Sequence, residues 1–246
     1  MKQKYLLKIA LLILLSFAIN QNIKAQSAGD IAFVGFNVET TIGEKDFSIV
    51  VLTSLAANSE IYIADRALDG LGGLEATEGT LLWSSGNSVI NAGTVVVFSN
   101  VNDDTTRTVS IGSVTEPDAG FNPTDKEGIF IYTGTDENTV TSFIYGLQIG
   151  NDDSETGDLT GSGLVLGTSF IVVDNSASPD GGYYNGSKNN QNVYNDYLSL
   201  ISNKTNWTTT TGNGYTLTIP FSQEAFTINT TNWTGGTSSV WNLAGN

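Results

Sequence analysis

The stretch DFSIVVLTSLAANSEIYIADR, from Asp46 to Arg66, contains two apolar runs, Phe47–Leu52 and Ile61–Arg66, separated by a short polar segment. Each run is shorter than a typical helix and rich in β-branched and aromatic residues, which is typical of buried strands. Asn58 lies between the runs, and asparagine accepts the left-handed backbone that tight turns require. The stretch therefore predicts two strands joined by a turn.

Short apolar runs of the same kind recur along the chain between segments rich in Gly, Asn, Asp and Ser, such as GLGG, NPTDKEG, NDDSETGD and SPDGG. This alternation predicts many short strands joined by turns. The run Thr94–Ser99 is apolar on both faces, which favours a central strand. The other expected strands are Ile31–Asn37, Thr80–Trp83, Thr108–Ile111, Gly128–Gly134, Ser142–Leu147, Ser169–Asp174 and Thr216–Phe221.

One segment, Asn189–Asn203, follows a helical pattern instead. Its apolar residues recur along one face, and Asn190 or Asn192 is available as the N-cap. They are Val193, Tyr194, Tyr197, Leu198 and Ile201. The predicted fold class is therefore mainly β: a β-sandwich with one short amphipathic helix near the C-terminal third of the chain.

Residues 1–25 have the pattern of a signal peptide. Lysines precede an apolar run from Ile9 to Ile19, and Ala25 stands where a signal peptidase accepts a small side chain. The run is too short for a typical membrane span, so we expect cleavage before Gln26 and a secreted or cell-surface protein. Removing this segment takes away four lysines and no acid, which lowers the net charge from −15 to −19 (six cations against 25 acids).

Charge and composition exclude several classes of function. A strongly acidic chain without clustered cations disfavours nucleic acid and anionic membrane surfaces as partners, and we expect no membrane insertion. The chain has no histidine and no cysteine, which excludes a Ser-His-Asp triad, an imidazole metal site, thiol nucleophiles and thiolate-bound zinc. Without disulfides, the fold must be stabilised by burial of its core.

Several segments together carry a resemblance: GDIAFVGFN, DFSIVVLTSLAANSEIYIADR, EGTLLWSSGNSVINAGTVVVFSN and NGSKNNQNVYNDYLSLISNKTNWT. Between Gly29 and Thr208 the chain resembles the lamin-tail-like (immunoglobulin-like) β-domain of exported, often multidomain, Bacteroidota-type proteins. The resemblance implies an immunoglobulin/lamin-tail-like β-sandwich and an extracellular location, and it brings no catalytic motif. Asn58 stands where the turn of such domains would carry glycine.

The apolar pattern ends at Ile228, so we expect a β-sandwich domain over residues 26–228. Residues 229–246 are expected to be a linker or the start of a further module. The sequence TNWT occurs at Thr205–Thr208 and again at Thr231–Thr234, and Trp241 lies after the second copy. The alternative is a last edge strand whose Trp233 and Trp241 fill the core. Trp207 is interpreted as a core residue.

With histidine and cysteine absent, carboxylates are the main candidates for catalysis and metal binding. Asp65, Asp69, Glu75 and Glu78 crowd one loop region, where a pair of carboxylates could serve glycoside hydrolysis. Two acidic loops offer oxygen ligands for Ca²⁺, which extracellular modules often bind. Neither loop has the spacing of an EF-hand, and solvated surface acids are the alternative in both cases. The predicted calcium ligands are Asp152, Asp153, Glu155 and Asp158 in the first loop and Asp174 and Asp180 in the second.

Two functions remain open. The first is a non-catalytic exported β-sandwich module for extracellular adhesion, glycan binding or display, with an extracellular glycan or a surface protein as its partner. Tyr183 and Tyr184, in DGGYYNG, are the candidate ligand residues, or they are apolar plugs of a loop. The second is an accessory domain of a secreted hydrolase or nuclease, because lamin-tail-like domains accompany such enzymes.

Overall fold

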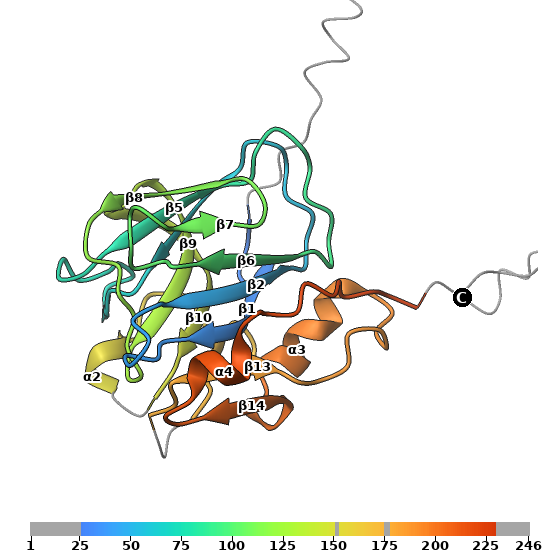
Figure 1. The fold of residues 1–246 in the computed structure, drawn as a ribbon. Helices are drawn as coiled ribbons and strands as arrows, with labels where there is room; N and C mark the ends of the chain where they lie inside the picture. Colours follow the sequence, from blue (N-terminus) through green and yellow to red (C-terminus); the bar gives the residue numbers. More distant parts are fainter. Residues whose placement is uncertain (1–25, 151–152, 175–177, 230–246) are drawn as a thin grey trace, which may run out of the picture.

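The computed structural model describes residues 26–150, 153–174 and 178–229, and consists mainly of two six-stranded β-sheets (Figure 1). The first sheet has the order β14 (Trp207–Thr210), β13 (Gly181–Tyr184), β1 (Ile31–Asn37), β2 (Asp46–Val51), β6 (Val95–Ser99) and β7 (Thr108–Val109). The second has the order β12 (Phe170–Val172), β10 (Thr139–Gln148), β9 (Gly128–Asp136), β3 (Glu60–Ala64), β5 (Thr80–Ser84) and β8 (Ser113–Asp118). Two short strands, β4 (Leu68–Asp69) and β11 (Gly157–Asp158), form a separate parallel pair.

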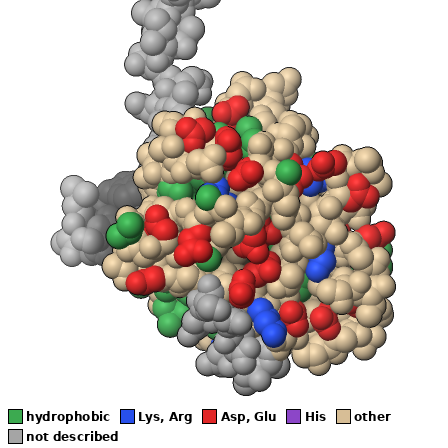
Figure 2. All heavy atoms as spheres, turned by 90° about the vertical axis from the view of Figure 1, so that its left-hand side faces the viewer, with side chains coloured by type: hydrophobic (Ala, Val, Ile, Leu, Met, Phe, Trp, Pro, Cys, Tyr) green, Lys and Arg blue, Asp and Glu red, His purple; other side chains and the backbone are tan. Residues whose placement is uncertain are grey.

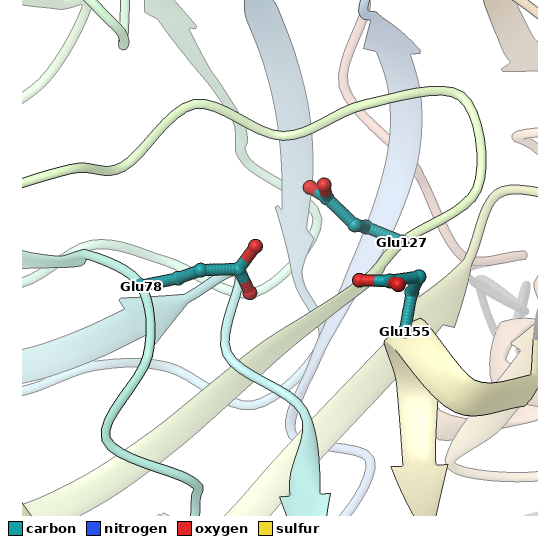
Figure 3. A group of neighbouring side chains, drawn as sticks. All are labelled: Glu78, Glu127 and Glu155. Atoms are coloured by element: carbon teal, nitrogen blue, oxygen red, sulfur yellow. The ribbon is translucent and has the colours of Figure 1, made fainter.

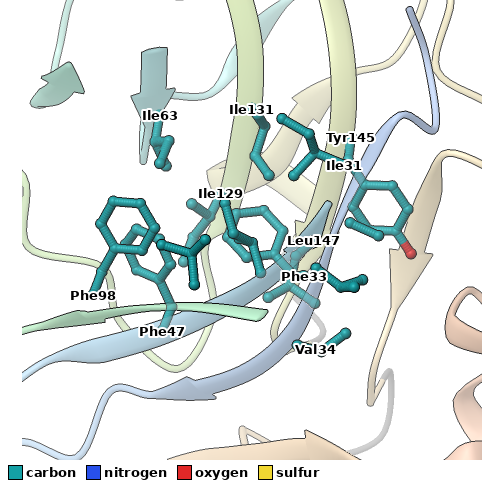
Figure 4. Close-up of a cluster of buried hydrophobic side chains, with 14 of the residues drawn as sticks. Ile31, Phe33, Val34, Phe47, Ile63, Phe98, Ile129, Ile131, Tyr145 and Leu147 are labelled. Atoms are coloured by element: carbon teal, nitrogen blue, oxygen red, sulfur yellow. The ribbon is translucent and has the colours of Figure 1, made fainter. Parts of the chain in front are cut away.

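The two sheets share one apolar core (Figure 4). Phe47 of β2 stacks on Phe98 of β6 with ring centroids 4.5 Å apart, and Trp83 of β5 meets Phe98 in a T-shaped contact at 5.6 Å. Phe33 of β1 lies 6.3 Å from Tyr145 of β10. All five side chains are buried, and they come from both sheets. The mainly β, two-sheet prediction is therefore confirmed.

The stretch Asp46–Arg66 connects the two sheets. β2 belongs to the first sheet and β3 to the second, and the chain crosses between them through residues 52–59. Asn58 has a φ of 58°, the left-handed conformation expected for it, and its N–H donates to the Gly86 carbonyl at 2.6 Å. The predicted strand Thr94–Ser99 becomes β6, which has a neighbour on each side.

The expected strand Thr216–Phe221 is wrong. Residues Gly214–Thr218 form the short helix α4, and the Ile219–Pro220 peptide bond that follows is cis. The Thr218 hydroxyl donates to the Gly214 carbonyl at 2.7 Å, which satisfies this helical turn locally. The segment crosses over β13 and β1 rather than extending a sheet, because β14 already occupies the sheet edge beside β13.

Strands β8, β13 and β14 were not expected. The sequence predicts a turn at Gly181 and Gly182 of β13, but close packing accounts for both glycines. A Cβ on Gly182 would lie 2.8 Å from the Phe36 ring, and one on Gly181 would lie 2.6 Å from the Gly214 Cα. Close packing, not turn geometry, therefore requires these glycines. β8 carries charged residues and Pro117, which is typical of the edge strand that it is.

The predicted helix is present as the 3₁₀ turn η1 (Tyr194–Asp196) followed by α3 (Tyr197–Ile201). Tyr197 and Ile201 are fully buried, as the apolar stripe requires, whereas Val193 is exposed. The expected asparagine N-cap is wrong, because the N-cap of η1 is Val193 and it makes no side-chain hydrogen bond. Instead, the Asn190 N–H donates to the Tyr197 hydroxyl at 3.0 Å.

A second 3₁₀ turn, η2 (Lys204–Asn206), leads into β14. There Trp207 packs against the core and its indole N–H donates to the Ile201 carbonyl at 2.7 Å, which agrees with its interpretation as a core residue. Phe226 is buried near the end of the described chain, and Ile228 packs against the same core. Residues 1–25, Trp233 and Trp241 lie outside the described residues, so the predictions made for them remain predictions.

The central aromatic contacts generate a stability prediction. Replacing Phe47 by Ala removes its contacts with Phe33, Phe98 and Phe121 and leaves a cavity between the sheets. We expect the free energy of unfolding to decrease by about 3–5 kcal/mol in chemical denaturation. Leu71→Ala, at a side chain that is 88% exposed, is the control and should change it by less than about 0.5 kcal/mol. Equal losses in the two variants would contradict this assignment of the core.

Candidate functional site

Three glutamates from three separate parts of the chain meet at one place. One carboxylate oxygen from each of Glu78, Glu127 and Glu155 lies within 4.8 Å of the other two, and the side chains point toward a common centre (Figure 3). Glu78 lies just before β5, Glu127 just before β9, and Glu155 in the short helix α2 (Asp153–Thr156). The face on which α2 lies carries many more acidic than basic side chains (Figure 2).

Glu127 is the buried member of this glutamate cluster. Its carboxylate accepts hydrogen bonds from the Thr124 N–H at 2.7 Å and the Thr124 hydroxyl at 2.8 Å, which fixes its position. Asp65, at the end of β3, is also buried and accepts from the Gly79 N–H at 3.1 Å and the Asn122 N–H at 2.6 Å. The backbone therefore holds two carboxylates in the interior.

Burial and mutual repulsion change the acidity of this region. Burial raises the pKa of Glu78 to about 7, and the charges of Glu127, Glu155 and Glu75 add to the increase. Burial likewise raises the pKa of Asp65 to about 8, in spite of the hydrogen bond from Asn122. The pKa of Glu127 is raised by burial and lowered in part by its bonds from Thr124.

Lys45 is a buried cation near these acids, but its ammonium is engaged elsewhere. It donates to the Val38 carbonyl at 2.8 Å and to the Pro123 carbonyl at 3.0 Å. Burial lowers the pKa of Lys45, whereas the charge of Glu127 raises it. Three carboxylates at this spacing suit a hard divalent cation such as Ca²⁺, and proton uptake is the alternative way to relieve their repulsion.

The predicted calcium ligands belong to two separate loops, and calcium binding by either loop stays a prediction. Among the described side chains of the six, Glu155 is the one that belongs to the glutamate cluster. Asp152 lies outside the described residues, and Asp153 begins α2. Asp158 lies in β11 and accepts from the Thr160 N–H at 2.8 Å. Asp174 follows β12, and the Asp180 carboxylate accepts a hydrogen bond from the Gly212 N–H.

Of the four loop carboxylates proposed for hydrolysis, Glu78 is in the cluster and Asp65 interacts with it electrostatically. Asp69 instead organises a turn, accepting from the Leu71 N–H at 2.7 Å and the Gly73 N–H at 2.8 Å. Sequence reasoning missed Glu127. The spacing Thr124-Asp-Lys-Glu127 was the available signal, because a hydroxyl residue three positions before Glu is a common reciprocal hydrogen-bonding pattern.

A second feature is a groove of about 530 Å³ on the outer face of the first sheet. Val34, Ser48 and Tyr183 contribute to it from β1, β2 and β13, and its walls are residues 184–189 and 217–224. The ring of Phe221 lies directly over Gly35, where a Cβ would be 2.6 Å from it. The glycine thus allows residues 217–224 to approach the sheet and form one wall.

The two tyrosines singled out in the sequence differ in role. Tyr184 is buried, its ring stacks on Phe226 at 5.7 Å, and its hydroxyl donates to the Ser187 carbonyl at 3.0 Å. Although Tyr184 borders the groove, most of its ring therefore belongs to the core. Tyr183 points to the opposite face of β13, is partly exposed and lines the groove.

Lys188 joins the two walls of the groove. Its ammonium lies 3.3 Å from the Ser222 hydroxyl and 3.7 Å from the Glu224 carboxylate. The Lys188 carbonyl also accepts from the Thr227 N–H at 2.7 Å. One end of the groove is therefore fixed by both main-chain and side-chain contacts.

Comparison with known protein families, curated proteins and solved structures finds no match to this chain. The resemblance to lamin-tail-like domains remains a prediction from the sequence. Within the described ranges, no helix has the length and apolar character to cross a membrane.

The raised pKa values of Glu78 and Asp65 predict that the free energy of unfolding decreases as pH rises. Between the ordinary pKa of 4.5 and about 7 for Glu78, and between 3.8 and about 8 for Asp65, the folded protein holds protons that the unfolded chain has released. The free energy of unfolding is therefore largest at the acidic end of this window and decreases as pH rises through it. We expect a lower melting temperature at about pH 8.5 than at about pH 6, in buffer without divalent cations.

Glu78→Gln should reduce this pH dependence, whereas Glu60→Gln, at an exposed position on β3, should leave it unchanged. An identical pH profile in wild type and Glu78→Gln would contradict the assignment. Repeating the series with millimolar Ca²⁺ tests the metal prediction. A rise in melting temperature near pH 8 that Glu127→Gln abolishes would identify the cluster as a cation site. Without such a rise, the cluster is accounted for by protons alone.

Proposed function

We propose that this protein is a non-catalytic exported module for extracellular adhesion, glycan binding or display, and that the groove beside Tyr183 is its ligand site. The observation that carries the proposal is the groove itself. Its volume of about 530 Å³ falls within the range of small-ligand sites, about 300–1,000 Å³. It combines an aromatic side chain with several hydroxyl, amide and charged groups.

The character of the fold supports a binding role. We infer that the two sheets form an immunoglobulin/lamin-tail-like β-sandwich, in keeping with the shared core and with the β2–β3 unit that turns at Asn58. Such a scaffold holds short strand ends and loops rigidly, and binding residues are commonly carried on loops of this kind. The groove walls, residues 184–189 and 217–224, are segments of that type.

The chemistry of the chain also favours binding over catalysis. A chain without histidine or cysteine lacks the side chains used most often for acid–base and thiol catalysis near neutral pH. The groove offers Lys188 and Glu224 as its ionisable pair, and these lie 3.7 Å apart. A partner in the extracellular space, a glycan or a surface protein, fits these groups better than nucleic acid, which the acidic net charge of −15 would repel.

The second candidate function, an accessory domain of a secreted hydrolase or nuclease, is favoured by one observation, the glutamate cluster. The high pKa of Glu78, about 7, suits a general acid, and Glu127 is a second carboxylate beside it. Hydrolysis of a polysaccharide by the purified chain, lost in Glu127→Gln and retained in Tyr183→Ala, would favour this candidate over the first.

Export is tested directly by mass spectrometry. If residues 1–25 are a signal peptide, the protein recovered outside the cells that produce it should begin at Gln26, as the free residue or its cyclised form. A secreted protein that retains Met1 would contradict this prediction.

Ligand binding is tested by Tyr183→Ala. We expect wild-type protein to bind at least one member of a panel of extracellular polysaccharides and surface proteins, and Tyr183→Ala to weaken that binding roughly tenfold or more, as loss of about 1.4 kcal/mol would do. Leu166→Ala is the control, because Leu166 is an exposed apolar residue that does not line the groove. Equal binding by both variants would place the ligand elsewhere.

A further inference from the structure

Ser48 stands out on the floor of the groove. It belongs to β2, lines the groove and is only 2% exposed. A Cβ added to Gly35 would lie 2.7 Å from the Ser48 hydroxyl oxygen and 2.6 Å from the Phe221 ring. The hydroxyl therefore lies on the outer face of the sheet, where the groove is. A hydrogen bond from a ligand to this largely buried hydroxyl would be shielded from water, so it would be stronger than a contact at the exposed rim.

The rim of the groove offers further unused hydrogen-bonding groups. The Tyr183 hydroxyl has no partner among the described residues. The side-chain amide of Asn185 uses one polar atom, to the Thr208 hydroxyl at 3.2 Å, and that of Asn189 uses one, to the Ser187 hydroxyl at 3.1 Å. Each amide keeps a second polar atom for a ligand. The groove therefore offers both donors and acceptors together with the aromatic ring of Tyr183.

The charges at the groove balance each other. Lys188 and Glu224 approach to 3.7 Å across one end, and they are the ionisable acid and base among the lining residues. A ligand with a net negative charge would also face the field of a molecule whose net charge is −15. A neutral ligand does not experience this repulsion, and it can form hydrogen bonds with both Lys188 and Glu224.

We infer that the groove binds a neutral, polyhydroxylated ligand, a short stretch of an uncharged oligosaccharide, with the Ser48 hydroxyl as a buried contact at its floor. This inference rests on the proposed function and names its ligand class. Sugar hydroxyls both donate and accept, so they match the Ser48 and Tyr183 hydroxyls and the two free amide atoms. The apolar face of a sugar ring packs on the Tyr183 ring, whose body is apolar and whose tip is polar.

Ser48→Ala is the decisive variant, because it separates binding from folding. It removes one small polar group, so the melting temperature should change little. Affinity for the ligand should fall roughly tenfold, since a buried polar contact is lost. Calorimetric titration of the full chain with neutral gluco-, galacto-, manno- and xylo-oligosaccharides, and with their uronate-containing counterparts, gives both the affinity and the ligand class.

Three further variants complete the experiment. Tyr183→Ala should weaken binding at least as much as Ser48→Ala, and Tyr183→Phe should weaken it less, because the ring is kept. Lys126→Gln, at an exposed lysine outside the groove, is the matched control for Lys188→Gln. We expect Lys188→Gln to weaken binding of the neutral sugar and Lys126→Gln to leave it unchanged.

The outcomes separate this inference from the proposed function. Binding of a neutral oligosaccharide that depends on both Ser48 and Tyr183 supports both. Binding of only uronates or of a protein, still dependent on Tyr183, overturns the neutral-sugar inference and leaves the groove as the ligand site. Neutral-sugar binding that is unchanged in Ser48→Ala removes Ser48 from the site and overturns the inference. If no member of the panel shows binding that depends on Tyr183, both the inference and the proposed function are wrong.

Discussion

The aromatic contacts between the two sheets are the interaction on which the rest of the structure depends. A chain without cysteine has no covalent link between its layers, so Phe47, Phe98 and Trp83 must hold them together by burial. Trp83 adds a directional contact, because its indole N–H donates to the Ile111 carbonyl at 2.9 Å. The crossing from β2 to β3 brings the sheets face to face, and the positions of both candidate sites follow from that arrangement.

The two sites arise from different parts of this arrangement. Gly35 and Ser48 lie opposite each other on the outer face of β1 and β2, whereas Phe33 and Phe47 of the same strands contact each other in the core. Phe221 can therefore lie close to the sheet, and the groove forms at its side. The glutamate cluster forms instead where loops from the second sheet end beside α2, and burial together with repulsion between the carboxylates raises the pKa of Glu78 and of Glu127.

Local pattern predicted much of the fold and little of the sites. For example, the run Ile31–Asn37 is rich in apolar residues, and the strand that it forms is buried at every position. Thr216–Phe221 has the same local pattern, but its packing across β13 decides its conformation, and no local signal carries that information. Gly181 and Gly182 led to the opposite error. They suggest a turn, but they lie in a strand, because glycine also occurs where chains pack closely.

The sites depend on contacts between residues far apart in the sequence. Glu78 and Glu155 were each singled out, but in separate groups, and only the fold brings them to Glu127. The difference between Tyr183 and Tyr184 follows from strand alternation, and it could have been predicted if β13 had been recognised as a strand. A position on a strand thus specifies which tyrosine faces the groove, whereas the spacing from Thr124 to Glu127 indicates a local hydrogen bond and not the meeting of three glutamates.

The place of β1 in its sheet has a consequence for the order in which the molecule can assemble. β1 pairs with β2, the next strand along the chain, on one side, but on the other it pairs with β13, so that Gly35 lies opposite Tyr183. Contacts between such distant parts of a chain make folding slow. The first sheet cannot close until nearly all of the described chain is present, and until then one edge of β1 stays unpaired. If the chain is exported, as we propose, this delay helps to keep it unfolded until its last strands have been made.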